Sequence, residues 1–109
     1  MSDRALLEAA AKAAGYTINA AHQAARDAVG GGRGGLWIDD VSTGWNPLAD
    51  DGDALRLAVK LKLNLEFFSQ GVHVMALGAQ PYSDDPYAAT RRAIVRAAAS
   101  IGSGKESAS

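Results

Sequence analysis

The segment from residue 45 to residue 61 constrains the fold most, because a turn, a helix start and an amphipathic helix follow one another in it. Proline fixes its own φ angle and moves the preceding residue away from helical backbone, so Asn46 and Pro47 predict a turn. Asp50 or Asp51 then offers a carboxylate that can accept backbone N–H groups at a helix start. A helix is therefore predicted to begin near residue 50.

The predicted helix has one charged face and one apolar face. Asp53 precedes Arg56 by three residues, a spacing at which the two side chains meet, and Lys60 continues the solvent side. Apolar residues recur at the helical period on the other side, where they are expected to be buried. They are Ala54, Leu57, Ala58 and Leu61, with Leu55 and Val59 widening the face.

The rest of the chain divides into short helix and strand patterns separated by glycine, proline and polar residues. Ser2 and Gly15 are expected to cap a first helix, and Asp85 with Pro86 is expected to begin the last one. Alternating apolar residues predict a hairpin whose turn holds Gly71 in a left-handed conformation. The expected elements are a helix at 3–14, strands at 16–19 and 36–38, a short helix or extended stretch at 20–29, a glycine loop at 30–35, a polar turn at 39–44, strands at 61–68 and 72–77, a loop at 78–84, and a last helix that Gly102 ends.

These patterns predict one α+β domain over residues 1–102, followed by a disordered polar tail at 103–109. The expected order is helix, strand, strand, helix, strand, strand, helix. It corresponds to an antiparallel sheet of three or four strands that packs between or against the helices. A chain of 109 residues has the size of a single domain, and alanine supplies much of its 48% of hydrophobic residues, so a thin core is expected.

Composition excludes several kinds of site. The chain has no cysteine, which rules out disulfides and thiolate metal sites. His22 and His73 are the only histidines, and the aspartates lack the spacing of a calcium loop, so we expect no metal and no cofactor. No apolar run reaches the length of a membrane span, and we expect a cytoplasmic protein without membrane contact. Nucleophile and phosphate-binding motifs are missing, so no enzyme is predicted.

The net charge is only −1, but the charged residues are unevenly distributed. Residues 39–53 include five aspartates and no lysine or arginine, whereas residues 91–96 include three arginines and no acid. Helix capping and solvation explain many such residues. The more specific, functional interpretation is a patch that recognises a partner. Two candidate sites follow: Asp39, Asp40, Asp50, Asp51, Asp53 and Trp45 for a protein partner, and Arg33, Arg91, Arg92 and Arg96 for nucleic acid.

Three segments of the chain resemble the phage ABA-sandwich domain, a family of small prophage proteins. They are residues 45–58, which contain the Trp-Asn-Pro-Leu turn and the aspartates after it, the C-terminal residues 91–99, and the opening residues 4–15. The resemblance implies a phage or prophage origin and a sheet between helices, and it implies no catalytic residues. Residues 16–35 resemble the family least, because the insert at 20–29 and the glycine run are unusual for it.

The function expected from these observations is non-enzymatic protein binding in a bacterial host cell. The leading hypothesis is a phage or prophage inhibitor of bacterial anti-phage defence, of the anti-CRISPR type. Its acidic patch would bind a host protein complex, such as a CRISPR–Cas subunit, in place of nucleic-acid phosphates. One alternative is a phage regulator that binds nucleic acid through the arginine-rich C-terminal helix, which is less favoured. Another is a phage structural or assembly subunit. A monomer or a dimer is expected.

Overall fold

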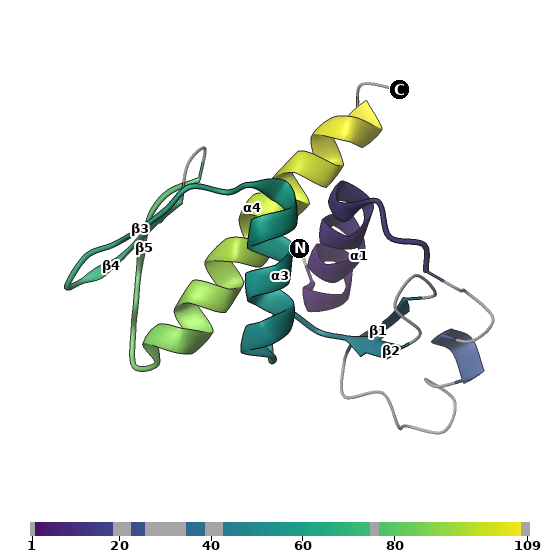
Figure 1. Ribbon diagram of the computed structural model, residues 1–109, viewed down its shortest axis with the longest axis horizontal. Helices are drawn as coiled ribbons and strands as arrows, with labels where there is room; N and C mark the ends of the chain where they lie inside the picture. Colours follow the sequence, from purple (N-terminus) through teal and green to yellow (C-terminus); the bar gives the residue numbers. More distant parts are fainter. Residues whose placement is uncertain (1, 19–22, 26–34, 39–42, 75–76, 108–109) are drawn as a thin grey trace.

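The computed structural model describes residues 2–18, 23–25, 35–38, 43–74 and 77–107 of the chain. These residues form a small α+β domain with helices and two antiparallel sheets, which confirms the predicted fold class (Figure 1). No helix in these ranges is both long and apolar enough to cross a membrane. The elements are α1 (Asp3–Ala14), β1 (Leu36–Ile38), β2 (Thr43–Trp45), α3 (Asp51–Leu61), β3 (Leu65–Phe67), β4 (Gly71–Val74), β5 (Gly78–Pro81) and α4 (Pro86–Ser107).

The first helix forms where its capping residues predicted it. The Ser2 hydroxyl accepts a hydrogen bond from the backbone N–H of Ala5 over 3.1 Å. Gly15 ends the helix in left-handed backbone, with a φ angle of 78°. A left-handed residue after a helix directs its own N–H back to the last carbonyl groups, which satisfies them. The helix expected at residues 3–14 is therefore confirmed.

The central helix also begins as predicted, but its apolar face is narrower. The Asp50 carboxylate accepts the backbone N–H of Asp53 over 2.8 Å and so caps α3. Leu57 is fully buried, as expected. Leu55 and Val59, however, are 61% and 67% exposed, so the prediction that they widen the buried face is wrong. The core covers only one stripe of this helix.

The strand expected at residues 61–68 is shorter than predicted, because α3 occupies its beginning. Lys62 adopts left-handed backbone, with a φ angle of 55°, and its N–H bonds the last carbonyl groups of α3. The helix therefore ends at Leu61, and the strand is limited to β3. It pairs with β4 in antiparallel register, with Glu66 opposite His73.

The three-stranded sheet has the order β3-β4-β5, and its last strand was not predicted. Residues 78–81, expected to be loop, pair with β4 in antiparallel register. The left-handed turn was also assigned to the wrong glycine, because Gly78 has a positive φ angle and Gly71 does not. Gly71 lies in β4 instead, where an added Cβ atom would meet the backbone of Gln80. The close approach of β5 explains the glycine at that position.

Two further strand predictions are corrected by the structure. Residues 16–19 were expected to form a strand, but Ile18 makes only an isolated bridge to Ile38. Residues 43 and 44 of the expected polar turn form β2 together with Trp45, and β2 pairs with β1. The strands thus form two separate sheets rather than one sheet of three or four strands. The predictions for residues 19–22, 26–34, 39–42, 75–76 and 108–109 lie outside the described part, and residues 23–25 are helical.

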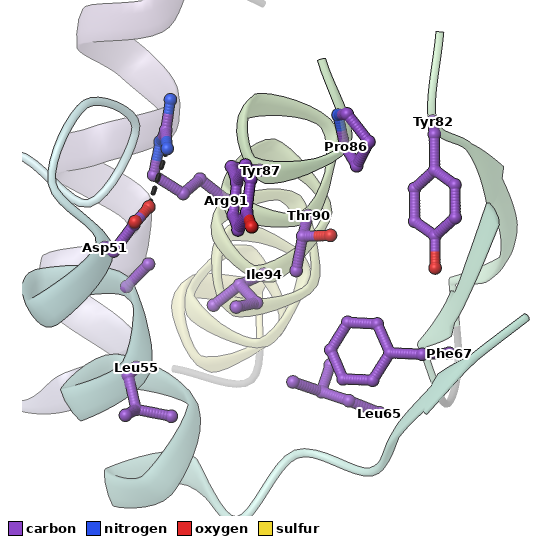
Figure 2. A pocket seen from close by; sticks show the side chains of 11 residues that line it. Asp51, Leu55, Leu65, Phe67, Tyr82, Pro86, Tyr87, Thr90, Arg91 and Ile94 are labelled. Carbon is purple, nitrogen blue, oxygen red and sulfur yellow. Dashed lines mark hydrogen bonds and ion pairs between the residues drawn. The ribbon is translucent and has the colours of Figure 1, made fainter.

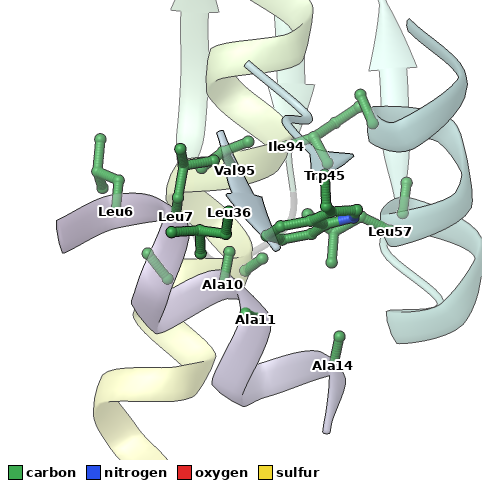
Figure 3. Close-up of a cluster of buried hydrophobic side chains, with 14 of the residues drawn as sticks. Leu6, Leu7, Ala10, Ala11, Ala14, Leu36, Trp45, Leu57, Ile94 and Val95 are labelled. Atoms are coloured by element: carbon green, nitrogen blue, oxygen red, sulfur yellow. The ribbon is translucent and has the colours of Figure 1, made fainter. Parts of the chain in front are cut away.

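The main hydrophobic core lies among α1, α3, α4 and the small sheet of β1 and β2 (Figure 3). A smaller cluster joins β4 to α4. The helix α1 packs most extensively on α4, and the buried residues of that contact are mostly alanines. Small side chains let two helix backbones approach closely. Large buried side chains of the main core are Leu7 from α1, Leu36 and Trp45 from the small sheet, Leu57 from α3 and Val95 from α4.

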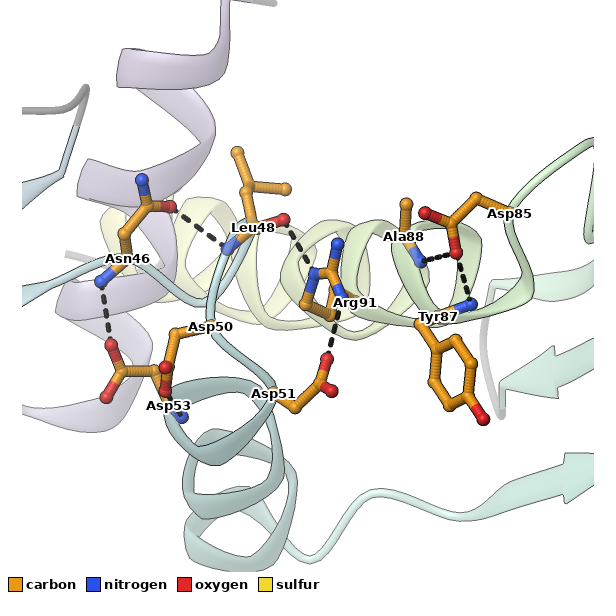
Figure 4. Close-up of polar contacts among 9 residues, drawn as sticks. All are labelled: Asn46, Leu48, Asp50, Asp51, Asp53, Asp85, Tyr87, Ala88 and Arg91. Atoms are coloured by element: carbon orange, nitrogen blue, oxygen red, sulfur yellow. Dashed lines mark hydrogen bonds and ion pairs between the residues drawn. The ribbon is translucent and has the colours of Figure 1, made fainter.

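The last helix begins at its predicted cap. Asp85 Oδ1 accepts the backbone N–H groups of Tyr87 and Ala88 over 3.0 and 3.2 Å, as Figure 4 shows. Pro86 occupies the first helical position, where its missing N–H costs no hydrogen bond. The start of α4 is therefore confirmed.

The end of the last helix was predicted wrongly. Gly102 was expected to stop it, but α4 continues, and the tail expected at 103–109 is helical as far as Ser107. Gly102 has a packing role instead, because a Cβ atom there would lie 2.0 Å from the carbonyl oxygen of Ala9 in α1. The glycine allows the two helix backbones to touch.

Candidate functional site

An open groove of about 480 Å³ lies between α3, β3 and the first turns of α4 (Figure 2). In this view α3 forms one wall, β3 forms the opposite wall, and α4 lies between them. The volume falls within the range of about 300–1,000 Å³ that is typical of ligand pockets. The residues lining the groove are Asp51, Ala54, Leu55, Leu65, Phe67, Tyr82, Pro86, Tyr87, Thr90, Arg91 and Ile94.

Three large apolar side chains of the groove are open to solvent. Leu55 of α3 is 61% exposed, Phe67 of β3 is 63% exposed and Tyr87 of α4 is 70% exposed. They come from three different elements and line the same groove. Burying one such side chain stabilises a protein by about 1.5–3 kcal/mol. Because three of them stay uncovered, the fold lacks several kcal/mol of this stabilisation. Contiguous exposed apolar surface of this kind marks a binding surface.

The pleat of the sheet explains why Phe67 reaches the groove. Leu65 pairs with Val74 and Phe67 pairs with Val72, so these four side chains lie on one face of the sheet. The two valines are fully buried against α4. Phe67 belongs to the outer strand, where α4 does not cover it, and it becomes part of the groove wall.

An ion pair between α3 and α4 lies at one end of the groove. Arg91 donates from Nη1 to Oδ1 of Asp51 over 2.6 Å and from Nε to the carbonyl oxygen of Leu48 over 2.9 Å (Figure 4). The Asp51 side chain is 69% exposed, whereas that of Arg91 is only 17% exposed. A partner in the groove would therefore meet the carboxylate, and the exposed charge at this end is acidic.

Replacing Arg91 by alanine is expected to lower the free energy of unfolding by about 1–2 kcal/mol, because the substitution removes two polar contacts and a mostly covered side chain. Arg96→Ala is the matched control on the same helix, since Arg96 is exposed and, among the described residues, donates to the side-chain oxygen of Gln80. Its effect should stay within about 0.5 kcal/mol. Urea unfolding followed by circular dichroism measures both values. Equal losses of unfolding free energy in the two variants would contradict a stabilising contact between α3 and α4 through Arg91.

The predicted acidic residues Asp50, Asp51 and Asp53 lie together at the start of α3, but they are not equivalent. Asp53 is only 15% exposed, accepts the backbone N–H of Asn46 over 3.0 Å and binds Arg56 over 2.7 Å. Its hydrogen bond is the main cause that raises the pKa of Arg56, which stays charged. The Asp50 and Asp51 side chains are 60% and 69% exposed. Asp53 therefore stabilises the fold, whereas Asp50 and Asp51 present their carboxylates to solvent.

Trp45, the aromatic residue of the predicted acidic site, is buried. It is 4% exposed, and its ring meets that of Tyr16 edge-to-face, with 5.6 Å between the centroids. The side chain belongs to the core and is not presented to a partner. Asp39 and Asp40 lie outside the described residues.

The predicted nucleic-acid site is divided between two surfaces. Arg91 lines the groove described above, whereas Arg92 and Arg96 line a second groove of about 450 Å³ beside β5. Arg92 pairs with Asp3 of α1 over 3.1 Å. Arg33 lies outside the described residues. The structure thus does not gather these arginines into one basic surface within its described part.

Sequence reasoning missed the exposed residues of the groove. Leu55 had a detectable signal, because it extends the apolar stripe of its helix beyond the width that one core usually covers. Phe67 had another, since Phe67 and Phe68 place an aromatic ring on each face of a short strand. Tyr87 had no comparable signal. Its exposure follows from how α4 meets α3 and β3.

No protein-family model, no curated protein and no solved structure matches the chain. The groove is therefore interpreted from its own chemistry. The resemblance to the phage ABA-sandwich domain stays a prediction.

Proposed function

We propose that the protein acts without catalysis, by binding an apolar segment of another protein in the groove between α3, β3 and α4. The observation that carries this proposal is the exposure of Leu55, Phe67 and Tyr87 around one groove. A partner that covers these side chains buries apolar surface that the fold itself leaves exposed, and this burial stabilises the complex. Large apolar anchors in a concave site dominate the affinity of many protein interfaces.

The charge beside the groove specifies the partner further. Asp51 presents its carboxylate at one end, whereas the exposed Asp84 and Asp85 line the second groove. A segment with lysine or arginine next to its apolar anchor complements the Asp51 carboxylate. Salt should therefore weaken its binding, because exposed charges are screened. In this proposal Asp51 acts at one end of the groove and not as part of a separate acidic patch.

The polar groups of the groove support binding over catalysis. Among its described lining residues, Asp51 and Arg91 are paired with each other, and the other polar side chains are the hydroxyl groups of Tyr82, Tyr87 and Thr90. Acid–base catalysis needs a positioned group that exchanges a proton near neutral pH. The hydroxyl groups and the ion pair suit recognition of a bound segment.

Changing Leu55 and Tyr87 together to glutamine is expected to weaken peptide binding about 10- to 100-fold, because the change removes two exposed anchors. The probe is a random twelve-residue peptide library displayed on phage and selected on the wild-type protein. Enriched peptides are then synthesised, and their Kd values are measured by fluorescence anisotropy. The enriched sequences should combine apolar and basic residues.

Val59→Gln is the matched control for this experiment. Val59 lies on the same helix as Leu55 and is 67% exposed, but it does not line the groove. Its substitution should leave the Kd unchanged. The proposal fails if no peptide is enriched, or if the enriched peptides bind the double variant as tightly as the wild type.

The setting that the phage resemblance implies gives a narrower proposal, in which the partner belongs to a bacterial anti-phage defence complex in the host cytoplasm. A nuclease-treated pull-down from a lysate containing such complexes tests it. The wild type and Val59→Gln should capture a defence subunit, and the variant changed at Leu55 and Tyr87 should not. Capture that disappears with nuclease would instead favour the nucleic-acid alternative.

A further inference from the structure

Within the described part of the chain, the outer edge of β3 carries backbone groups that pair with no strand. β3 is the first strand in the order β3-β4-β5, and no described strand pairs with its other side. Phe68 donates its N–H to the carbonyl oxygen of Gly71 over 2.8 Å, which makes these two a hydrogen-bonded pair of the hairpin. Hydrogen-bonded and non-bonded pairs alternate along an antiparallel ladder. Glu66 therefore bonds β4, and the N–H and C=O groups of Leu65 and Phe67 point away from it.

This edge opens onto the groove. Leu65 and Phe67 line the groove wall that faces Leu55 of α3 (Figure 2). A strand added to β3 would lie about 4.8 Å from it, which places the new strand over α4 and between β3 and α3. Every second side chain would point to the groove face. The intervening side chains would lie beside Glu66 on the opposite face of the sheet.

We propose that the partner segment binds in extended conformation and adds a strand to the edge of β3, with apolar side chains on the groove face and a lysine or arginine opposite Glu66. This inference rests on the proposed function and defines the conformation and sequence pattern of the bound segment. Glu66 is 68% exposed, and its carboxylate lies 3.9 Å from His73 Nδ1 on the neighbouring strand. Its charge is therefore accessible to a cross-strand partner, and opposite charges stabilise such pairs.

A second copy of this chain fits the edge poorly. If two β3 strands paired antiparallel through Leu65 and Phe67, each Glu66 would lie directly opposite its counterpart. Like charges at opposite positions destabilise a strand pair. A foreign segment with a basic residue at that position removes the repulsion.

The test uses a nine-residue peptide that alternates valine with lysine, titrated into the whole protein and followed by fluorescence anisotropy. In an antiparallel addition the valine N–H groups would face β3, and a second peptide of the same sequence carries N-methyl groups on these valines. It keeps the side chains and the charge but loses the ladder hydrogen bonds. Its Kd should therefore be at least about tenfold higher than that of the unmodified peptide. The amide protons of Leu65 and Phe67 should become protected from hydrogen exchange only with the unmodified peptide.

Charge reversal at Glu66 tests the basic residue of the pattern. Glu66→Lys should weaken binding of the valine–lysine peptide by about fivefold and favour a valine–glutamate peptide instead. Glu8→Lys is the matched control, because it changes the net charge equally at an exposed position of α1. It should leave the Kd almost unchanged.

Several results would overturn strand addition, and they separate it from the proposed function. Equal binding of the two peptides, or unchanged exchange at Leu65 and Phe67, would exclude it. The groove would nevertheless stand as a binding site if library peptides still lost affinity for the variant changed at Leu55 and Tyr87. A dimer in light scattering that protects the same two amides would identify a second copy as the occupant. If neither the library nor the alternating peptides bind, both proposals fail.

Discussion

Replacing Trp45 by alanine is expected to lower the free energy of unfolding by about 3–5 kcal/mol, because the substitution leaves a cavity in the main core. Trp45 is 4% exposed, packs edge-to-face on Tyr16 and pairs with Leu36 of β1. Figure 3 shows its ring between Leu36 and Leu57. A small domain has about 5–15 kcal/mol of stability in total, so the loss is a large fraction of it. Urea unfolding followed by far-ultraviolet circular dichroism measures the change.

Trp37→Ala is the matched control for this prediction. Trp37 lies on β1 and is half-buried, because it points to the face opposite that of its buried neighbours Leu36 and Ile38. Its substitution should cost less than half as much as Trp45→Ala. Trp45→Phe keeps an aromatic ring and should cost about 1–2 kcal/mol, which gives a measurable value even if the alanine variant does not fold. Equal losses at the two tryptophans would contradict the position of Trp45 in the core.

Changing Gly102 to alanine is expected to cost about 2–3 kcal/mol, although alanine favours helix by about 1 kcal/mol over glycine in an exposed position. The new Cβ atom would lie 2.0 Å from the carbonyl oxygen of Ala9 and 2.9 Å from its carbonyl carbon. Both atoms are backbone, so no rotation of a side chain relieves the overlap, and α1 and α4 must separate. The midpoint of thermal unfolding should fall by about 10 °C.

Ser100→Ala provides the control for helix propensity. Ser100 is exposed on the same helix, so its change to alanine should leave stability unchanged or raise it slightly. Thermal unfolding by circular dichroism or differential scanning calorimetry measures both variants. A gain in stability for Gly102→Ala would mean that α1 and α4 are not in close contact at this point.

The helix starts and the roles of their acidic residues could be predicted because they depend on short stretches of chain. Ser2 and Asp50 each bond a backbone N–H three residues further on, and Asp85 does so two and three residues further on. Such caps are set by local geometry, which the order of residues contains directly. The pairing of Asp53 with Arg56 is local in the same sense.

The sheets were predicted less well because short strands are defined by their partners. β3 and β1 have only three residues each, too few for alternation to decide between strand and loop. β5 contains Gly78 and Pro81 and has little strand propensity of its own, yet it pairs with β4 over four residues. Pairing with a distant segment outweighs local preference in such cases.

By itself the sequence determined the α+β class, the capped starts of α1, α3 and α4, and the acidic cluster at the start of α3. These features arise from interactions within a few residues. Only the tertiary structure decided that Trp45 is buried while Leu55, Phe67 and Tyr87 stay exposed around one groove. It also decided that Arg91 reaches Asp51 across 40 positions of the chain, and that Gly102 meets Ala9. Burial and close approach depend on which distant segments meet, and the spacing of residues along one segment does not specify that.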